Sequence, residues 1–318
     1  MSHRIPVTVV TGFLGSGKTT LLSNLLHGTP DRRLAIVVNE FGEVSIDGAV
    51  LRGGRTDGVE VHDLAGGLVA YGEEDRFGPI MEAIRERKNH IDHVLVETSG
   101  LALPVGVLEA LERPGLREHF VLDATLAVVD TPLLLAGELD GAAEGEVRAA
   151  VSVVFERQLE HADVVVLNKI DGMDEERLLD AETRVRERAP RVRFVELAYG
   201  ARLDTRLTLG LQLHASAPAH SHHHHHGPVR SAPGEGAAPL ADQAALDGHA
   251  HGELPAHAHG AGTHEHFHEH DPGWQSFVLR SDGRLDPETL RDAVREAALQ
   301  QPILRAKGFA QLDPHHRL

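Results

Sequence analysis

Near its N-terminus the chain reads Gly12-Phe13-Leu14-Gly15-Ser16-Gly17-Lys18-Thr19, following an apolar run at residues 5–10. The residues that follow, 20–27, have the composition of a helix. The pattern G-x-x-x-x-G-K-[ST] between a strand and a helix predicts a phosphate-binding loop. In such a loop the backbone N–H groups turn toward phosphate oxygens, and the helix N-terminus adds positive potential. The stretch therefore predicts a nucleotide site but does not identify the nucleotide.

The same loop predicts roles for single residues. We expect the Lys18 ammonium to reach the terminal phosphates and to stabilise charge during phosphoryl transfer. The Thr19 hydroxyl would hold Mg²⁺. The residues expected to contact the phosphates or their Mg²⁺ are Gly12, Gly15, Ser16, Gly17, Lys18, Thr19 and Thr20.

Apolar runs alternate with helical stretches through the first 200 residues. Strands are predicted at residues 7–11, 34–38, 93–96, 126–129 and 163–167. Helices are predicted at residues 79–88, 104–112, 147–160 and 175–188. Continuous apolar strands alternating with helices indicate a parallel sheet covered on both faces. The predicted fold class is therefore α/β: a P-loop NTPase with α/β/α layers and a mostly parallel sheet.

The composition changes near residue 213, where the chain becomes rich in His, Ala, Gly, Pro, Glu and Asp. This bias predicts a disordered, His-rich linker. After it we expect a strand from Trp274 and a helix with Asp286 as its N-cap and Pro287 at its first position. The predicted domains are 1–212 for nucleotide binding, 213–272 for the linker and 273–318 for a small α+β domain.

A second motif predicts which base is bound. The predicted strand 163–167 runs into Asn168-Lys169-Ile170-Asp171. The Asp171 carboxylate can accept two hydrogen bonds from guanine, whereas adenine lacks that donor pair and would leave the carboxylate unpaired in a partly buried site. We expect Asn168 to tie the motif to the phosphate loop, and the Lys169 stem to cover the base. The predicted ligand is therefore GTP.

Two acidic segments complete the expected site. Glu97 ends the predicted strand 93–96, where such proteins place a carboxylate for Mg²⁺ or for the attacking water, and the Gly100 N–H is expected to sense the γ-phosphate. Glu40 and Glu43 lie in an acidic, glycine-containing loop that suits a nucleotide-dependent switch. The expected Mg²⁺ ligands are Thr19, Glu40 and Glu97, and the expected catalytic residues are Lys18, Glu43 and Glu97.

The bulk composition argues against several classes of protein. The net charge of −17 disfavours nucleic acid and anionic membranes as partners. No apolar run reaches the roughly 18 residues of a membrane span. Met1 leads directly toward the first apolar run, which predicts no secretory signal. Cysteine is absent, so disulfides and thiolate metal ligands are excluded. We expect a cytoplasmic protein.

Histidine is concentrated in one segment. Fifteen of the 24 histidines lie between residues 214 and 270. Flexible imidazole arrays bind Zn²⁺, Co²⁺, Ni²⁺ and Cu²⁺. The segment is interpreted as a metal-collecting arm or, alternatively, as a linker that binds metal only incidentally. The proposed transition-metal ligands are His222, His224, His226, His264, His266, His268 and His270.

Together these motifs resemble those of the CobW-type GTPases, the CobW/HypB/UreG metallochaperone family. The resemblance rests on residues 10–20, 39–43, 46–48, 97–104, 168–171 and 304–309. It implies GTP hydrolysis with Mg²⁺, coupled to delivery of zinc or cobalt to a metal-requiring client protein. The stretch Thr-Ser-Gly-Leu-Ala-Leu-Pro within it looks most like the cobalamin-biosynthesis branch. The oligomeric state stays open, with a homodimer as one option.

One departure from the family pattern concerns the metal. Leu68, Ala70 and Tyr71 stand at the three cysteine positions of the family's C-x-C-C motif. Leucine and alanine cannot ligate zinc, and a lone tyrosine is a poor ligand. Two hypotheses follow: a GTP-hydrolysing metallochaperone, or a GTP-gated adaptor or His-rich metal-storage protein with little catalysis.

Overall fold

The computed structural model describes most of the chain up to residue 214 and a short stretch near the C-terminus. The described residues are 4–29, 31–40, 48, 51, 59–65, 75–140, 146–205, 209–214, 279, 284–300, 303, 305–308 and 310, with only the backbone described at 40, 65 and 146–149. The chain divides into two units, Met1–Ala215 with Asp271–Leu318, and Ser216–His270. Of the strand expected from Trp274 the structure describes only Leu279, which lies in no strand, and all seven proposed histidine ligands lie outside the described residues.

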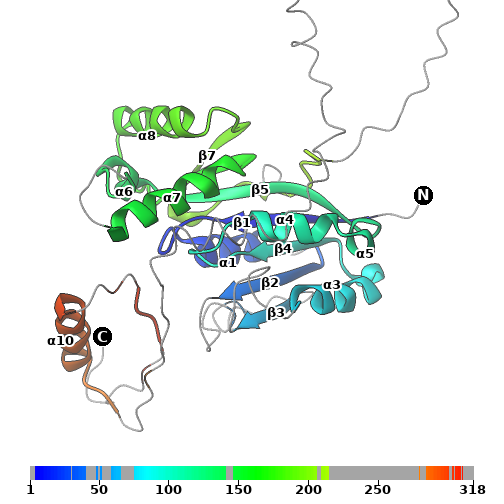
Figure 1. The fold of residues 1–318 in the computed structure, drawn as a ribbon, viewed down its shortest axis with the longest axis horizontal. Coiled ribbons are helices and arrows are strands. Elements are labelled where there is room, and N and C mark those ends of the chain that lie inside the picture. The colour runs from blue at the N-terminus through cyan, green and yellow to red at the C-terminus, as the bar shows by residue number, and fades with distance from the viewer. Residues whose placement is uncertain are drawn as a thin grey trace, which may run out of the picture. The chain divides into compact units, whose positions relative to one another are not determined.

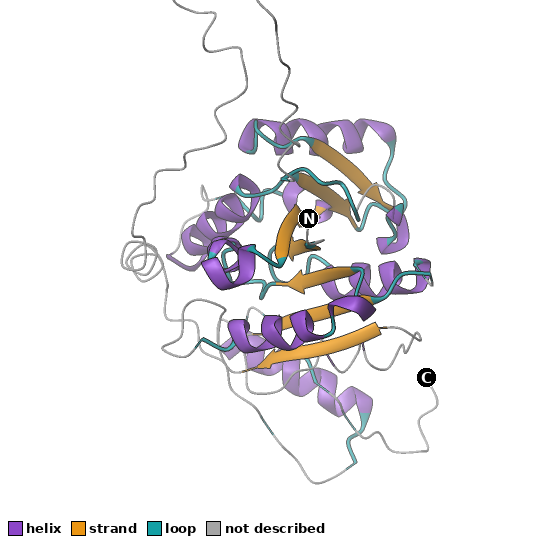
Figure 2. Cartoon of the chain, turned by 90° about the vertical axis from the view of Figure 1, so that its right-hand side faces the viewer, coloured by secondary structure: helices purple, strands orange, loops and turns teal. Residues whose placement is uncertain are grey.

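The described strands form one parallel sheet. They are β1 (Ile5–Thr11), β2 (Leu34–Glu40), β3 (Val59–Ala65), β4 (His93–Glu97), β5 (Phe120–Asp130), β6 (Val164–Asn168) and β7 (Phe194–Ala198). Their order across the sheet is β3-β2-β4-β1-β5-β6-β7 (Figures 1 and 2). Every neighbouring pair is parallel, so the predicted α/β class is confirmed.

Helices cover both faces of this sheet. They are α1 (Lys18–Gly28), α3 (Phe77–Glu86), α4 (Val105–Glu112), α5 (Pro114–Arg117), α6 (Thr131–Leu135), α7 (Glu146–Glu160) and α8 (Glu175–Arg188), with 3₁₀ turns η1 (Lys88–His90) and η2 (Tyr199–Ala201). Helix α1 packs its leucines against one face. Helices α3 and α4 pack on the opposite face over β1, β2 and β4, and α7 and α8 pack there over β5 and β6 (Figure 1). The expected three-layer arrangement is therefore present.

The two edge strands were not predicted from the sequence. Strand β3 carries Glu60, His62 and Asp63 among its seven residues, so it does not read as a continuous apolar run. Strand β7 has five residues, and Phe194 and Leu197 are exposed on it. Edge strands commonly carry charge and are short, which weakens the hydrophobic pattern that identifies central strands.

A buried polar cluster occupies the amino edge of the sheet. The bulge between β1 and β5 lies beside Asp123, whose carboxylate accepts hydrogen bonds from the backbone N–H groups of Gly210 (2.7 Å) and Gln212 (2.5 Å). The Thr8 hydroxyl lies 3.3 Å from the same carboxylate and 2.8 Å from Nε2 of His93. Burial lowers the pKa of His93 to about 4. This cluster anchors the segment that leads into the His-rich region.

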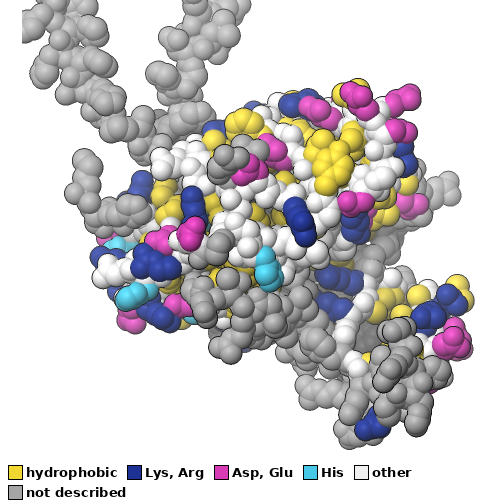
Figure 3. All heavy atoms as spheres, turned by 180° about the vertical axis from the view of Figure 1, so that it is seen from behind, with side chains coloured by type: hydrophobic (Ala, Val, Ile, Leu, Met, Phe, Trp, Pro, Cys, Tyr) yellow, Lys and Arg dark blue, Asp and Glu magenta, His cyan; other side chains and the backbone are white. Residues whose placement is uncertain are grey.

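The β7 end of the sheet is only partly covered by the described residues. Phe194, Leu197 and Tyr199 are exposed by 46%, 40% and 52%. Figure 3 shows hydrophobic side chains at this end, with acidic and basic side chains interspersed. None of the helices in the described part of the chain is long and apolar enough to cross a membrane.

The C-terminal stretch contains one described helix, α10 (Pro287–Gln300). The Asp286 carboxylate accepts a hydrogen bond from the Thr289 backbone N–H at 2.8 Å. This contact is the N-cap that the sequence predicted, with Pro287 at the first helical position.

Candidate nucleotide site

The glycine-rich loop connects β1 to α1 at the carboxyl edge of the sheet. Gly17 is the N-cap of α1 and has left-handed backbone angles, φ 98° and ψ 22°. A Cβ atom at this position would lie 2.3 Å from Nδ2 of Asn168. Both the conformation and the close approach require glycine. The loop is therefore shaped jointly by the start of α1 and by the end of β6.

Lys18 is buried, with only 5% of its surface exposed. Its Nζ donates to the carbonyl oxygens of Gly12 at 2.7 Å and Phe13 at 3.3 Å. These bonds hold the ammonium across the loop. The arrangement places a positive charge where the loop would receive phosphate oxygens.

Thr19 and Glu97 meet beside Lys18. Strand pairing places Glu97 opposite Val10 of β1, and the Thr19 hydroxyl donates to Glu97 Oε1 at 2.8 Å. Glu97 is 2% exposed. The sequence predicted both residues as Mg²⁺ ligands, and the fold brings them into direct contact.

Two further polar side chains near this pair are buried without a hydrogen-bond partner among the described residues. They are the Ser16 hydroxyl and both polar atoms of the Asn39 amide. Asn39 follows Val38, which is paired with Glu97 in the sheet. Buried polar groups are nearly always paired in proteins, and Mg²⁺ prefers hydroxyl, carboxylate and water oxygens. This donor set fits a hydrated Mg²⁺ with phosphates.

Gly100 lies against the phosphate loop. A Cβ atom on Gly100 would lie 2.7 Å from the backbone nitrogen of Leu14. The amide of Gln158, a fully buried residue of α7, donates to the carbonyl oxygens of Gly100 at 3.2 Å and Ala102 at 3.0 Å. The segment expected to sense the γ-phosphate is therefore held between the loop and α7.

The guanine motif lies at the end of β6. Asn168 Nδ2 donates to the Ser16 carbonyl oxygen at 2.8 Å, which is the expected tie to the phosphate loop. Asp171 accepts a hydrogen bond from the Gly200 N–H at 2.9 Å. Asn24 of α1 donates to the carbonyl oxygens of Gly200 and Ala201. Asp171 itself is exposed, not partly buried as we expected, because the loops beside it leave it open to solvent.

Lys169, the second residue of this motif, is held by a carboxylate that the sequence analysis missed. Its backbone is left-handed, with φ 60°. Its Nζ pairs with Oδ2 of Asp130 at 2.5 Å. Asp130 ends β5 directly opposite Asn168.

The structure describes only some of the remaining predicted residues. Gly15 and Thr20 are exposed. Glu43 lies outside the described residues, as do Leu68, Ala70 and Tyr71, and of Glu40 the structure describes only the backbone at the end of β2.

Asp130, Gln158 and Gly200 were not predicted as site residues. Asp130 did carry a signal, because an Asp between an apolar strand and Thr131-Pro132 is a helix N-cap pattern. Gln158 lies on the helix face that also carries Phe155 and Leu159, where a polar side chain is unusual. Gly200 gave no signal beyond a single glycine after a short strand.

Three features lie at one edge of the sheet: a phosphate loop, a hydroxyl paired with a carboxylate, and a guanine motif. Together they define a P-loop nucleotide-binding protein. The profile of the family described as CobW/HypB/UreG, nucleotide-binding domain, matches residues 6–196. The profile of the cobalamin synthesis protein cobW C-terminal domain matches residues 274–318. The chain belongs to the CobW/HypB/UreG family of P-loop GTPases, as its motifs indicated.

Several curated relatives are similar along much of the chain. A zinc chaperone CobW from Sinorhizobium sp is 30% identical over 97% of this chain and 82% of its own length. A zinc chaperone CobW from Pseudomonas aeruginosa is 36% identical over 67% of this chain and 61% of its own. The zinc-regulated GTPase metalloprotein activator 1 of Dictyostelium discoideum is 28% identical over 61% of this chain and 46% of its own length.

Proposed function

We propose that this protein is a cytoplasmic metallochaperone that binds and hydrolyses GTP and uses the nucleotide state to deliver a divalent metal to a client protein. The contact that carries the proposal is the 2.8 Å hydrogen bond from Thr19 to Glu97. It joins the start of α1 to the end of β4, where a Mg²⁺-bound phosphate chain would lie. The names of the relatives, zinc chaperone and metalloprotein activator, support the metal and client parts.

The chain's own groups would act on GTP in defined ways. Lys18 and the loop amides would stabilise negative charge on the oxygens of the transferring phosphoryl group. The N–H of Gly100, whose carbonyl oxygen accepts a hydrogen bond from Gln158, would contact the γ-phosphate. Glu43 or Glu97 would orient the attacking water, whose oxygen bonds to the γ-phosphorus as the bond to the β-phosphate oxygen breaks. The products are GDP and inorganic phosphate.

The cation that accompanies GTP has a fitting donor set. Thr19 and Glu97 would hold Mg²⁺, with Glu40 as a further candidate and with Ser16 and Asn39 available to its water or to phosphate. When bound, Mg²⁺ supplies charge neutralisation on the phosphate oxygens.

The transported metal is proposed to be zinc or cobalt, and cobalt would link the protein to cobalamin biosynthesis. Since the chain has no cysteine, nitrogen and oxygen ligands must bind it. The histidines at 222, 224, 226, 264, 266, 268 and 270 are the proposed collecting ligands. Neutral imidazole binds metals and loses affinity when protonated, so metal uptake should fall below about pH 6.5.

A direct test combines nucleotide and metal titrations. Zn²⁺ and Co²⁺ binding is measured by calorimetry on the full chain and on a variant lacking residues 216–270, each with GDP and with a non-hydrolysable GTP analogue. A site that survives the deletion and changes affinity with the nucleotide supports delivery. Loss of all metal binding on deletion, with no effect of nucleotide, contradicts it.

The second candidate is a GTP-gated adaptor or His-rich metal-storage protein with little catalysis. The absence of cysteine favours it, because the family's C-x-C-C positions hold Leu68, Ala70 and Tyr71. This candidate predicts several metal ions per chain and GTP turnover that does not respond to metal. Metal content by mass spectrometry, together with turnover measured with and without Zn²⁺ or Co²⁺, separates the two.

A further inference from the structure

We propose that Asp130 is a positioning residue for guanine nucleotide recognition, acting through Lys169, and that a clamp between α6 and α8 holds it in place. The inference rests on the proposed GTP binding. It concerns a carboxylate outside the motifs, on a different strand from the guanine motif.

The Asp130 carboxylate makes two contacts at once. Oδ1 accepts a hydrogen bond from the Leu133 backbone N–H at 3.2 Å, so Asp130 is the N-cap of α6. Oδ2 accepts from Lys169 Nζ at 2.5 Å. The Asp130 side chain is 9% exposed, whereas that of Lys169 is 45% exposed. The buried, doubly bound Asp130 therefore fixes the direction of the more exposed Lys169 side chain.

Fixing Lys169 matters because a lysine side chain has many rotamers. Its stem is expected to lie over the guanine plane, and binding must then immobilise it. Ordering one such side chain in advance removes part of the entropy cost of binding. The expected effect on the dissociation constant is about three- to tenfold.

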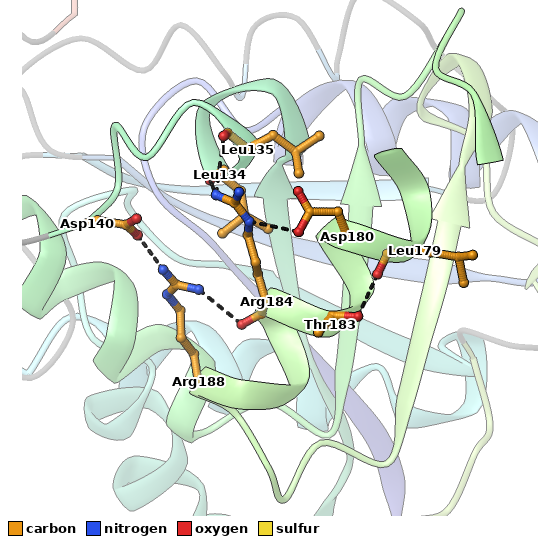
Figure 4. A network of polar contacts seen from close by, with 8 residues as sticks. All are labelled: Leu134, Leu135, Asp140, Leu179, Asp180, Thr183, Arg184 and Arg188. Carbon is orange, nitrogen blue, oxygen red and sulfur yellow. Dashed lines mark hydrogen bonds and ion pairs between the residues drawn. The ribbon is translucent and has the colours of Figure 1, made fainter. Parts of the chain in front are cut away.

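Helix α6 needs support, because a helix of five residues is not stable alone. Its last carbonyl groups have few partners within the helix, although that of Leu134 accepts from the Gly137 backbone N–H at 3.2 Å. Arg184 of α8 adds a donor: its Nη1 lies 3.2 Å from the carbonyl oxygens of both Leu134 and Leu135 (Figure 4). Asp180 orients the same guanidinium through Nε at 3.1 Å.

Arg188 extends this clamp. It donates to the Arg184 carbonyl oxygen at 3.1 Å and to Asp140 at 2.5 Å (Figure 4). Helix α8 starts at Glu175, with Asp174 as its N-cap, three residues after Asp171. The guanine motif is thus connected to α8 along the chain and to α6 through the Lys169–Asp130 pair.

The substitution Asp130→Asn separates positioning from capping. Asparagine caps helices as well as aspartate does, so α6 keeps its N-cap while the pair with Lys169 is lost. Because the cap is kept, the loss in the free energy of unfolding should stay below about 1 kcal/mol, a loss that would shift the melting temperature by a few degrees. We therefore expect the melting temperature to stay within about 2 °C of that of the wild type. We expect the dissociation constant for GDP to rise three- to tenfold, and KM for GTP to rise more than kcat falls.

The experiment measures binding of methylanthraniloyl-labelled GDP to the full chain. The proteins are the wild type, Asp130→Asn, Lys169→Ala and the double variant. If Asp130 acts through Lys169, the double variant binds no more weakly than Lys169→Ala alone. Additive effects, or wild-type affinity in Asp130→Asn, would overturn the inference while leaving GTP binding intact.

The clamp is tested on α8 with a matched pair. Arg184→Lys loses the planar guanidinium that Asp180 orients through Nε and should weaken GDP binding about twofold. Arg186→Lys changes an exposed residue of the same helix, paired with Glu182, and should leave affinity unchanged. Equal affinities in both variants would remove the clamp from the proposal. A wild type that binds no guanine nucleotide would contradict both this inference and the proposed function.

Discussion

The two ends of the central sheet treat their buried polar groups differently. At the amino edge, the Asp123 carboxylate accepts from two backbone N–H groups and lies near the Thr8 hydroxyl, and only Nδ1 of His93 lacks a partner among the described residues of this cluster. At the carboxyl edge, the Ser16 hydroxyl and the Asn39 amide are buried without a partner among the described residues. The amino edge pairs its buried carboxylate within the fold, which stabilises the protein, whereas the carboxyl edge leaves several polar atoms beside the phosphate loop that suit a ligand.

The largest effect is expected from Lys18→Ala at the carboxyl edge. Removing the buried ammonium takes away a charge that would stabilise the transferring phosphoryl group. GTP turnover should fall at least about a thousandfold, measured by phosphate release. The exposed Lys88→Ala is the matched control. Turnover within tenfold of the wild type would place the active groups elsewhere.

At the amino edge, Asp123→Asn should reduce stability and leave nucleotide binding unchanged. The amide retains one acceptor oxygen and points an N–H₂ group at a backbone donor. The expected loss is about 2 kcal/mol in the free energy of unfolding, measured in urea. Asp31→Asn, at an exposed position, should have no effect. If Asp123→Asn lost GTP affinity but kept its stability, the amino edge would bind the nucleotide and our assignment of the two edges would be wrong.

Gln158→Leu tests a buried contact that should both stabilise the fold and support the nucleotide site. The substitution keeps the volume but leaves the Gly100 and Ala102 carbonyl oxygens without their donor. Stability should fall by about 1 kcal/mol, and kcat should fall about tenfold because Gly100 loses its support. Arg157→Ala, on the exposed side of α7, is the control. A stability loss with unchanged kcat would limit Gln158 to a structural role.

The last expected effect is limited to the pH dependence of stability and concerns His93. Burial dominates the lowered pKa of His93, with Asp123 raising it and Arg32 lowering it further. Because the unfolded chain binds this proton below about pH 6.5 and the folded chain only near pH 4, stability should fall as pH drops through that window. The slope is at most about 1.4 kcal/mol per pH unit.

The variant His93→Gln should remove the fall in stability between about pH 6.5 and pH 4 that His93 causes. The variant His90→Gln, at an exposed position, should not. Melting temperatures at several pH values between about 4 and 7 check this. An unchanged pH profile in His93→Gln would show that the buried imidazole does not control it.

The sequence predicted the parts of the site that are contiguous in the chain. The phosphate loop and residues 168–171 are motifs whose spacing is set by local backbone geometry, and the alternating pattern predicted the parallel sheet. Asp130 and Gln158 could not be predicted as site residues, because each is a single side chain brought in by packing. The exposure of Asp171 depends on the surrounding loops, which no local pattern encodes.

The central claim is that the carboxyl edge is a guanine nucleotide site where GTP is hydrolysed. Phosphate release from GTP and from ATP by the full-length protein, with Mg²⁺, tests it most directly. We predict turnover of GTP at least about a hundredfold faster than of ATP, since guanine offers the Asp171 carboxylate two N–H donors that adenine lacks. No GTP turnover, or equal rates with ATP, would contradict the account.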